Sequence, residues 1–270
     1  MSTFKRVVLT HGGSSSRLKE SDGPQSAAAE GMDLMVNGKS ALDAAVHAVK
    51  YLEDDPRFNA GTGSKIRIDG STIQMDASCM DSDGKFGAVA CVEGIQNPVE
   101  LAHRVLIHSP HILLAGDGAK IFAQEQHIPI ISSSTDKKRN THEDDITPSC
   151  DTVGAVAFDG KIFAAALSSG GISKSAIGRV GDVPLPGCGL HCGSIGAVAC
   201  TGDGEYIALK ILAREVYSWL EKKMDPDEAA KKAIALFDDY VDIGLIVITK
   251  DGYAANARND MAWSHCTEMK

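Results

Sequence analysis

Short apolar runs rich in β-branched residues alternate along this chain with stretches whose apolar residues recur every three to four positions. The first kind predicts buried strands and the second predicts amphipathic helices. Both kinds occur in both halves, so both halves should contribute to one core. The predicted strands cover residues 6–10, 65–68, 72–77, 86–92, 153–158, 162–167, 197–200, 243–249 and 253–257, and the predicted helices cover residues 24–35, 41–53, 98–107, 116–126, 206–222 and 227–240.

Turn residues indicate which predicted strands pair. Asp69-Gly70, Asp159-Gly160 and Asp251-Gly252 each separate two apolar runs. An Asp-Gly pair between such runs is typical of a tight β-hairpin. We therefore expect an α+β fold of mostly antiparallel hairpins sandwiched by helices.

Helix starts carry their own signals. Ser40 is predicted to cap the helix at 41–53, with Asp43 at the capping-box position. Asn97 followed by Pro98 is typical of an N-cap with proline at the first helical position, so Asn97 is predicted to cap the next helix.

Composition excludes several classes of protein. The 270 residues carry a formal charge of −9, which argues against binding nucleic acid or an anionic membrane surface. The longest apolar runs, such as Ile243 to Ile248, are far shorter than the roughly 20 residues that span a bilayer. No signal peptide is visible at the N-terminus. We therefore expect a cytoplasmic protein.

Cysteine usage agrees with that expectation. The seven cysteines are an odd number in a chain without a visible leader, which favours reduced thiols. Cys188, His191 and Cys192 lie close together in sequence, but no second pair completes a tetrahedral zinc site. Buried small side chains are the better interpretation of these cysteines.

The stretch from Cys150 to Glu205 holds the candidate chemistry. A polar segment, Ser132 to Pro148, precedes it and ends just before an apolar strand that begins with Thr152. Cleavage between Asp151 and Thr152 would give Thr152 a free α-amine beside its hydroxyl. The chain is thus predicted to produce an N-terminal nucleophile.

Seven blocks of the sequence resemble, in order, those of the N-terminal-nucleophile asparaginases and isoaspartyl peptidases (plant-type asparaginases). The resemblance covers nearly the whole chain. The blocks are His11-Gly12-Gly13, Asn59-Ala60-Gly61-Thr62-Gly63-Ser64, Met75-Asp76-Ala77-Ser78-Cys79-Met80-Asp81, Asn97-Pro98, Asp151-Thr152-Val153-Gly154-Ala155-Val156, Gly178-Arg179-Val180-Gly181-Asp182 and Cys200-Thr201-Gly202-Asp203-Gly204-Glu205.

The resemblance implies a four-layer αββα sandwich of the N-terminal-nucleophile hydrolase type, formed by residues 1–270 as a single domain. It also implies autocatalytic cleavage into fragments 1–151 and 152–270, and a homodimer of cleaved protomers. The implied activity is hydrolysis of L-asparagine and β-aspartyl dipeptides, with no cofactor for catalysis.

Site roles follow from the same motifs. Thr152 matches the nucleophile, and Thr201 with the backbone N–H of Gly202 matches the oxyanion hole. Asn59 and Ser169 match positions that support the nucleophile.

The substrate's α-groups have matching positions as well. Arg179 would hold the carboxylate of an amino acid and Asp182 its ammonium, because a guanidinium binds a carboxylate bidentately. Glycines at 202 and 204 would let the substrate approach closely.

The α-amine assignment has a physical basis. A hydroxyl needs a base near neutrality to become a nucleophile. A free α-amine has a reference pKa of about 7.7–8.0, against about 10.4 for lysine. A terminal threonine can therefore serve as both attacker and base once it has been freed.

A structural sodium ion is a further implication of the resemblance. The family often holds one on backbone carbonyls of a loop that matches Leu52 to Thr62. The matching carbonyls are those of Leu52, Glu53, Asp55, Phe58, Ala60 and Thr62.

Three departures from the family pattern stand out. The usual Thr-Ser-Thr-Gly-Gly reads Leu167-Ser168-Ser169-Gly170-Gly171 here. Asp203 replaces a small hydroxyl residue beside the expected oxyanion hole, and we expect its carboxylate to face solvent or cap the following helix. The residues after His11-Gly12-Gly13 are Ser14-Ser15-Ser16 rather than Ala-Gly.

Alternative functions remain open. Ser168–Gly171, Pro186–Gly189 and Ile211–Glu215 favour the threonine aspartase branch, an endopeptidase of the same family, although Asp182 would then face an uncharged peptide nitrogen. The lysosomal glycosylasparaginase branch fits less well, because no leader or disulfide framework is visible. An uncleaved, inactive homologue acting as a binding protein is a third hypothesis.

Overall fold

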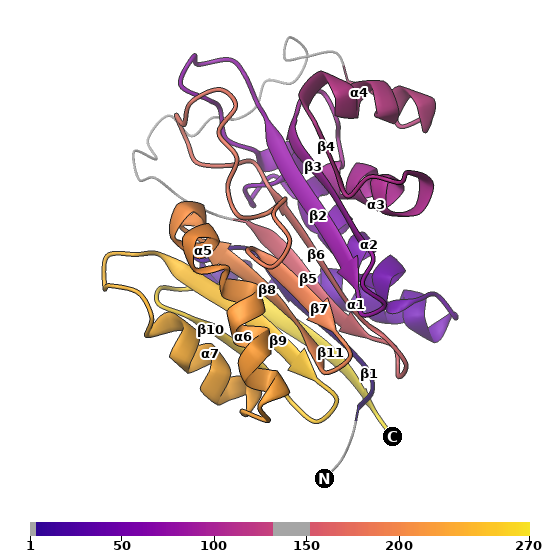
Figure 1. Ribbon diagram of the computed structural model, residues 1–270, viewed down its shortest axis with the longest axis vertical. Coiled ribbons are helices and arrows are strands. Elements are labelled where there is room, and N and C mark those ends of the chain that lie inside the picture. Colours follow the sequence, from indigo (N-terminus) through magenta and orange to yellow (C-terminus); the bar gives the residue numbers. More distant parts are fainter. Residues whose placement is uncertain (1–3, 132–151) are drawn as a thin grey trace.

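The computed structural model describes residues 4–131 and 152–270. In these ranges the chain forms a mixed α/β fold with two sheets and seven α-helices (Figure 1). The predicted polar segment at 132–148 and the residue before the expected cleavage, Asp151, lie outside the described residues.

One sheet has seven strands in the order β11-β1-β5-β6-β2-β3-β4, and the other has four in the order β10-β9-β8-β7. The strands are β1 (Phe4–His11), β2 (Met75–Asp81), β3 (Phe86–Val92), β4 (Leu113–Ala115), β5 (Val153–Phe158), β6 (Phe163–Ser169), β7 (Leu190–Gly193), β8 (Gly196–Gly202), β9 (Ile243–Thr249), β10 (Tyr253–Ala257) and β11 (Trp263–Met269). The helices are α1 (Asp22–Val36), α2 (Ala41–Asp54), α3 (Pro98–His108), α4 (Gly116–Glu125), α5 (Gly204–Lys210), α6 (Leu212–Glu221) and α7 (Pro226–Ile234), with short 3₁₀ turns η1 (Leu18–Glu20) and η2 (Gly61–Gly63).

In the larger sheet, strands from before and after the expected cleavage position lie side by side. β5 lies between β1 and β6, and it is antiparallel to both. The register places Gly154 opposite His11 on one side and Leu167 on the other. The first residues of β5 are therefore held on both sides by backbone ladders.

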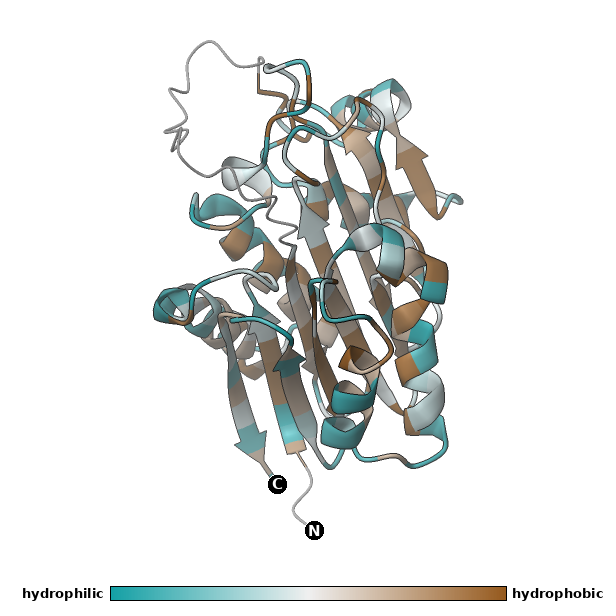
Figure 2. Ribbon diagram, turned by 90° about the vertical axis from the view of Figure 1, so that its left-hand side faces the viewer, coloured by the Kyte–Doolittle hydropathy of each residue, from teal (hydrophilic) through white to brown (hydrophobic). Residues whose placement is uncertain are grey.

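Three clusters of buried apolar side chains hold the elements together. One packs α1–α4 against the larger sheet, a second fills the space between the two sheets, and a third packs α5–α7 against the smaller sheet. Apolar residues accordingly concentrate on the strands, and polar residues on the outer surfaces of the helices (Figure 2).

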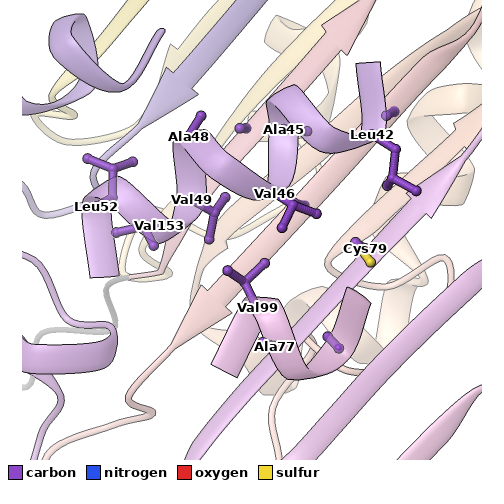
Figure 3. Close-up of a cluster of buried hydrophobic side chains, with 14 of the residues drawn as sticks. Leu42, Ala45, Val46, Ala48, Val49, Leu52, Ala77, Cys79, Val99 and Val153 are labelled. Atoms are coloured by element: carbon purple, nitrogen blue, oxygen red, sulfur yellow. The ribbon is translucent and has the colours of Figure 1, made fainter. Parts of the chain in front are cut away.

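α2 shows how the sequence pattern produces this packing. Leu42, Val46, Val49 and Leu52 recur at helical spacing, and all four are buried in the first cluster (Figure 3). They pack over β5, β6 and β2, the strands that lead to the candidate site. Burying each such side chain contributes about 1.5–3 kcal/mol.

Both helices begin where the sequence predicts. Ser40 Oγ accepts the Asp43 N–H at 3.1 Å, as predicted. Asn97 occupies the predicted N-cap position of α3 and Pro98 the first turn, but the Asn97 side chain donates to Asp54 and makes no capping hydrogen bond. Glu53, at the end of α2, accepts the Val99 N–H at 3.0 Å and caps α3 from a different helix.

Two predicted elements differ in the structure. Residues 65–68 form no strand, because the Arg67 side chain is buried there and donates to the Gln74 carbonyl at 2.8 Å. The helix predicted at 206–222 is two helices, broken at Ile211, whose φ of 47° is left-handed. Because of this break, Ala213 at the start of α6 can donate its N–H to Cys188 O.

Other helix and strand boundaries also differ from the prediction. The helix predicted at 227–240 ends at Ile234, and the short strands β4, β7 and β11 were not predicted.

Within the described ranges, no helix is both long and apolar enough to cross a membrane. The six cysteines in those ranges are free thiols. The cytoplasmic location stays a prediction.

The buried Glu53 cap makes stability depend on pH. Burial raises the pKa of Glu53 to about 8, although Ser168 and the Val99 N–H partly offset it. The folded protein then holds this proton more tightly than the unfolded chain does. Stability should therefore fall as pH rises from the ordinary pKa of 4.5 through about 8.

We expect Glu53→Gln to remove this loss, because glutamine keeps an acceptor oxygen for Val99 and cannot ionise. Between pH 5 and pH 9 the variant should gain on the wild type by about 4 kcal/mol in free energy of unfolding. Urea denaturation at both pH values measures the difference, with the exposed Glu125→Gln as control. An unchanged pH dependence would contradict a protonated Glu53.

Candidate active site

The described residues form a small, partly open cavity at the start of β5. It brings together five residues that the motifs singled out: Thr152, Ser169, Arg179, Asp182 and Gly202. The other lining residues are Asp76, Gly171, Ile172, Gly181 and Val183. Residues as far apart in sequence as Asp76 and Gly202 are thus neighbours here.

Thr152 immediately precedes β5, and its side chain is almost fully buried. The β5 ladders to β1 and β6 fix the backbone that follows it. The ring of His11 lies against Gly154, where a Cβ would come within 2.2 Å of Nε2. Burial lowers the pKa of His11 to about 3, so the imidazole is neutral beside Thr152.

Arg179 reaches the cavity already oriented by a carboxylate. Its Nε and Nη2 donate to the two carboxylate oxygens of Glu205 at 2.8 and 2.6 Å. Burial lowers the pKa of Arg179, but Glu205 outweighs it and the net shift is upward. This bidentate contact uses the Nε edge of the guanidinium and leaves the edge formed by Nη1 and Nη2 for another anion.

Asp182 is a buried carboxylate that lacks a full set of partners. Its Oδ2 has no hydrogen-bond partner among the described residues, and the side chain is 3% exposed. Burial raises its pKa to about 7, and Arg179 partly offsets the rise. A Cβ on Gly204 would lie 2.7 Å from Asp182 Oδ1, so a glycine keeps this space open. A small cationic group would satisfy the carboxylate.

Two further charged residues were not predicted to belong to the site. Asp76 lines the cavity and accepts the Cys91 N–H at 2.8 Å. Burial raises its pKa, while the nearby charges of Arg67 and Arg179 lower it. Asp76 and Glu205 both lie inside motif blocks, so the motifs could have marked them as site residues. Nothing in the sequence indicated that they lie near Arg67 and Arg179.

Thr201 and Gly202 end β8 at the cavity. Gly202 lines it, whereas Thr201 is fully buried and does not. Thr201 Oγ1 accepts the Ser14 N–H at 3.2 Å, which leaves its own hydroxyl hydrogen to donate. Gly202 has a φ of 127°, and a Cβ there would lie 2.2 Å from Asp242 O. Only glycine fits this position.

Asp203 was expected either to face solvent or to cap α5, and its side chain is half-buried. It occupies the N-cap position of α5 but makes no capping hydrogen bond to that helix. Its carboxylate instead accepts the Asp242 N–H at 2.9 Å. The prediction that it caps the helix is therefore wrong.

Asn59 and Ser169 fix the loop that follows β6. Asn59 Nδ2 donates to Gly171 O at 2.7 Å, and Ser169 Oγ accepts the Gly171 N–H at 3.0 Å. Asn59 does not line the cavity. Leu167, one of the departures, packs in the core between the sheets against Gly154.

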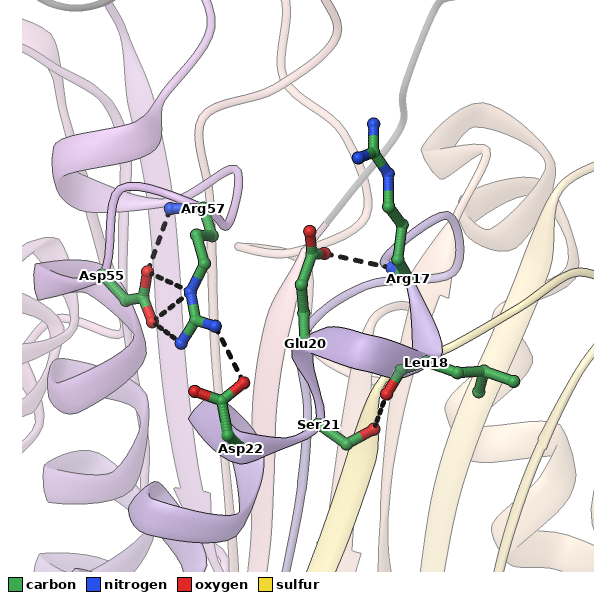
Figure 4. Close-up of polar contacts among 7 residues, drawn as sticks. All are labelled: Arg17, Leu18, Glu20, Ser21, Asp22, Asp55 and Arg57. Atoms are coloured by element: carbon green, nitrogen blue, oxygen red, sulfur yellow. Dashed lines mark hydrogen bonds and ion pairs between the residues drawn. The ribbon is translucent and has the colours of Figure 1, made fainter.

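The carbonyl-rich loop at 52–62 is anchored by Arg57. Its guanidinium donates to Asp55 within the loop and to Asp22 on α1 (Figure 4). The turn that follows passes close to the end of α2, because a Cβ on Gly61 would lie 2.4 Å from Glu53 O.

Comparison with known proteins places the chain. The sequence profile described as asparaginase matches residues 5–145 and 132–269. The chain is 41% identical over 274 residues to an isoaspartyl peptidase/L-asparaginase of Rattus norvegicus, covering 91% of this chain and 81% of that protein. It is 39% identical over 290 residues to one of Danio rerio, covering 98% and 93%. It is 34% identical over 297 residues to a plant-type L-asparaginase of Pyrococcus furiosus, covering 96% and 95%.

These matches span nearly the whole chain, and they confirm the resemblance that the seven motif blocks carried. With residues of four motif blocks gathered around one cavity and nearly its full length aligned to such relatives, this protein belongs to the asparaginase family.

Proposed function

We propose that the protein hydrolyses L-asparagine and β-aspartyl dipeptides, with Thr152 as its N-terminal nucleophile. The observation that carries the proposal is the charge pattern of the cavity. The buried Asp182 carboxylate needs a cation, and Arg179 offers a guanidinium edge for an anion. A free amino acid presents both charges on one carbon. The names of the relatives agree with this substrate class.

Self-cleavage is the first step of the proposed mechanism. Thr152 Oγ attacks the carbonyl carbon of Asp151, and the bond to the Thr152 nitrogen breaks as an ester forms. Water hydrolyses that ester, which leaves a carboxylate on Asp151 and a free amine on Thr152. The amine then has a pKa near 8, suited to accept the hydroxyl proton at neutral pH.

Hydrolysis uses the freed residue twice. The Thr152 amine takes the Oγ proton, and Oγ attacks the side-chain carbonyl carbon of asparagine. The resulting ammonium of Thr152 returns the proton to the leaving nitrogen, so ammonia departs and a β-aspartyl ester remains. Water, deprotonated by the same amine, hydrolyses the ester to aspartate. For a β-aspartyl dipeptide the leaving group is the second amino acid.

The oxyanion of each tetrahedral intermediate would lie at the end of β8. Thr201 would donate its hydroxyl and Gly202 its backbone N–H. Preorganised donors of this kind typically lower the barrier by about 2.7–4 kcal/mol each. Ser169 and Asn59 would keep the loop beside the nucleophile in place, and Gly204 would leave room for the substrate.

The family-level expectations fit the same proposal. Residues 1–270 form one domain with the αββα arrangement of N-terminal-nucleophile hydrolases, and cleaved protomers assemble as a homodimer. No cofactor takes part in the chemistry. A structural sodium ion would be held by the carbonyls of Leu52, Glu53, Asp55, Phe58, Ala60 and Thr62.

Substrate discrimination separates this function from the aspartase alternative. Asparagine and a β-aspartyl dipeptide should be hydrolysed, whereas N-acetylasparagine should lose about 100-fold in kcat/KM. Acetylation removes the ammonium and leaves Asp182 buried without a cation, which costs roughly 1–3 kcal/mol or more. Product release measured for each substrate side by side tests this.

The control is a peptide with an internal, ordinary aspartyl bond. If that peptide or N-acetylasparagine is cleaved as fast as asparagine, the endopeptidase alternative is correct and the amino-acid clamp is not.

Binding should also depend on pH through Asp182. Its pKa of about 7 in the free protein means that it is largely neutral at pH 6, yet only the ionised form pairs with an ammonium. The Kd for aspartate should therefore weaken by up to about tenfold per pH unit below pH 7. Calorimetric titration between pH 5.5 and 8 measures it. Asp182→Asn should bind more weakly and lose this dependence, and a dependence that persists in the variant would contradict the assignment.

A further inference from the structure

Two departures from the family pattern meet at one residue that lies outside every motif block. Ser14 Oγ and Ser15 Oγ both donate to Asp242 Oδ2, at 2.8 and 2.5 Å. Asp203 and Asp242 bind each other through two hydrogen bonds: Asp242 N–H donates to Asp203 Oδ2 at 2.9 Å, and Asp203 N–H donates to Asp242 O at 2.9 Å. The extra serines and the extra acid thus belong to a single network.

Asp242 is itself held in place. Its other oxygen, Oδ1, accepts Asn259 Nδ2 at 2.9 Å. The guanidinium of Arg258 donates to the carbonyls of Ile234 and Phe237 at 2.9 Å each, which fixes the segment between α7 and Asp242. The carboxylate therefore sits at a defined position before β9.

The network ends on the two groups expected to hold the oxyanion. The backbone N–H of Ser14, whose hydroxyl Asp242 holds, donates to Thr201 Oγ1 at 3.2 Å. Asp242 O lies where a side chain of Gly202 would be. A hydroxyl that accepts an N–H can still donate its own hydrogen, and the accepted bond polarises that donor. Fixing Ser14 therefore fixes the direction in which Thr201 can donate.

We propose that Asp242 is a positioning residue for the oxyanion hole, acting through Ser14 on Thr201 and through its backbone on Gly202. The proposal rests on the function proposed above and adds to it a residue that the motifs do not contain. It also joins the two expected fragments, since Ser14 precedes the cleavage position and Asp242 follows it. Asp203 is part of the same support, so its charge is directed to the Asp242 N–H.

A reciprocal exchange tests the contacts. In Asp242→Asn, one acceptor oxygen becomes an amide donor, so either the Asn259 amide or the two serine hydroxyls must reorient and the contact to Ser14 is less firmly fixed. We expect kcat for asparagine to fall about 10-fold, a fraction of the roughly 10²–10³ lost when a donor itself is removed. KM should stay within about 2-fold. Rates are divided by the fraction of cleaved chains, obtained from intact mass.

In the double variant Asp242→Asn with Asn259→Asp, every donor again faces an acceptor. The amide oxygen at position 242 accepts from the two serine hydroxyls, and its NH₂ group donates to the carboxylate at position 259. The kcat of the double variant should return to within about 2-fold of the wild type. Asp225→Asn is the control, since it makes the same exchange at another loop carboxylate, one that accepts the Asp227 N–H away from the oxyanion hole, and it should leave kcat unchanged. If Asp242→Asn fails to fold, the double variant and Ser15→Ala still test the positioning role. Ser15→Ala should lose less kcat than Asp242→Asn.

Thr201→Val separates the two proposals. If it keeps the wild-type kcat, the oxyanion-hole assignment fails. If it loses activity while Asp242→Asn does not, only the positioning role is overturned. A loss in Asp242→Asn that appears in KM alone, or that the exchange with Asn259 does not restore, also overturns it, because either result indicates a merely structural residue.

Discussion

The pairing of β5 with β1 and β6 is the constraint on which the rest of the structure depends. It fixes the residues after Thr152 from both sides, and one of the partner strands, β1, comes from the opposite end of the chain. A cut before Thr152 would leave β5 in the same sheet, because its ladders join it to strands of both fragments. Each backbone hydrogen bond contributes only about 0.5–1.5 kcal/mol, but two complete ladders and the α2 contacts act together. The fold can thus tolerate the loss of the peptide bond that its proposed chemistry requires.

The charged side chains around the cavity determine which ligand it can bind. Buried carboxylates at Asp76 and Asp182 lie near the buried guanidinium of Arg67 and the half-buried one of Arg179, and Glu205 orients the latter from the outside. Such groups are costly to bury unless each finds a partner. Asp182, whose carboxylate is incompletely partnered among the described residues, is therefore the lining residue that most favours a ligand, and a zwitterionic amino acid would supply the missing cation together with an anion for Arg179.

Local sequence signals predicted the elements well where local forces decide them. The Asp-Gly turn and alternating apolar runs predicted β9 and β10 at their observed bounds, and Ser40 caps α2 as expected. Contacts between distant segments decided the rest. Asn97 is the N-cap residue of α3 as predicted, but the side-chain hydrogen bond to the start of that helix comes from Glu53 on another helix. The helix predicted at 206–222 breaks at Ile211, where the start of α6 donates to the loop at 187–188.

The candidate site shows the same division. The motifs located Thr152, Arg179, Asp182 and Gly202, and the structure gathers all four around one cavity. The support given by Glu205 and Asp242 could not be predicted, since it depends on side chains 26 and 228 residues from their partners Arg179 and Ser14. Sequence spacing carries no information about such contacts unless they lie on one helix or strand.

The central claim is that Thr152 becomes the N-terminal residue of an active enzyme. Intact-mass analysis of the purified protein tests it most directly. The account predicts two fragments, 1–151 and 152–270, from the wild type, and a single uncut chain from Thr152→Ala. A wild-type protein that remains one chain after prolonged incubation, or a Thr152→Ala variant that is cut at the same bond, would contradict the account.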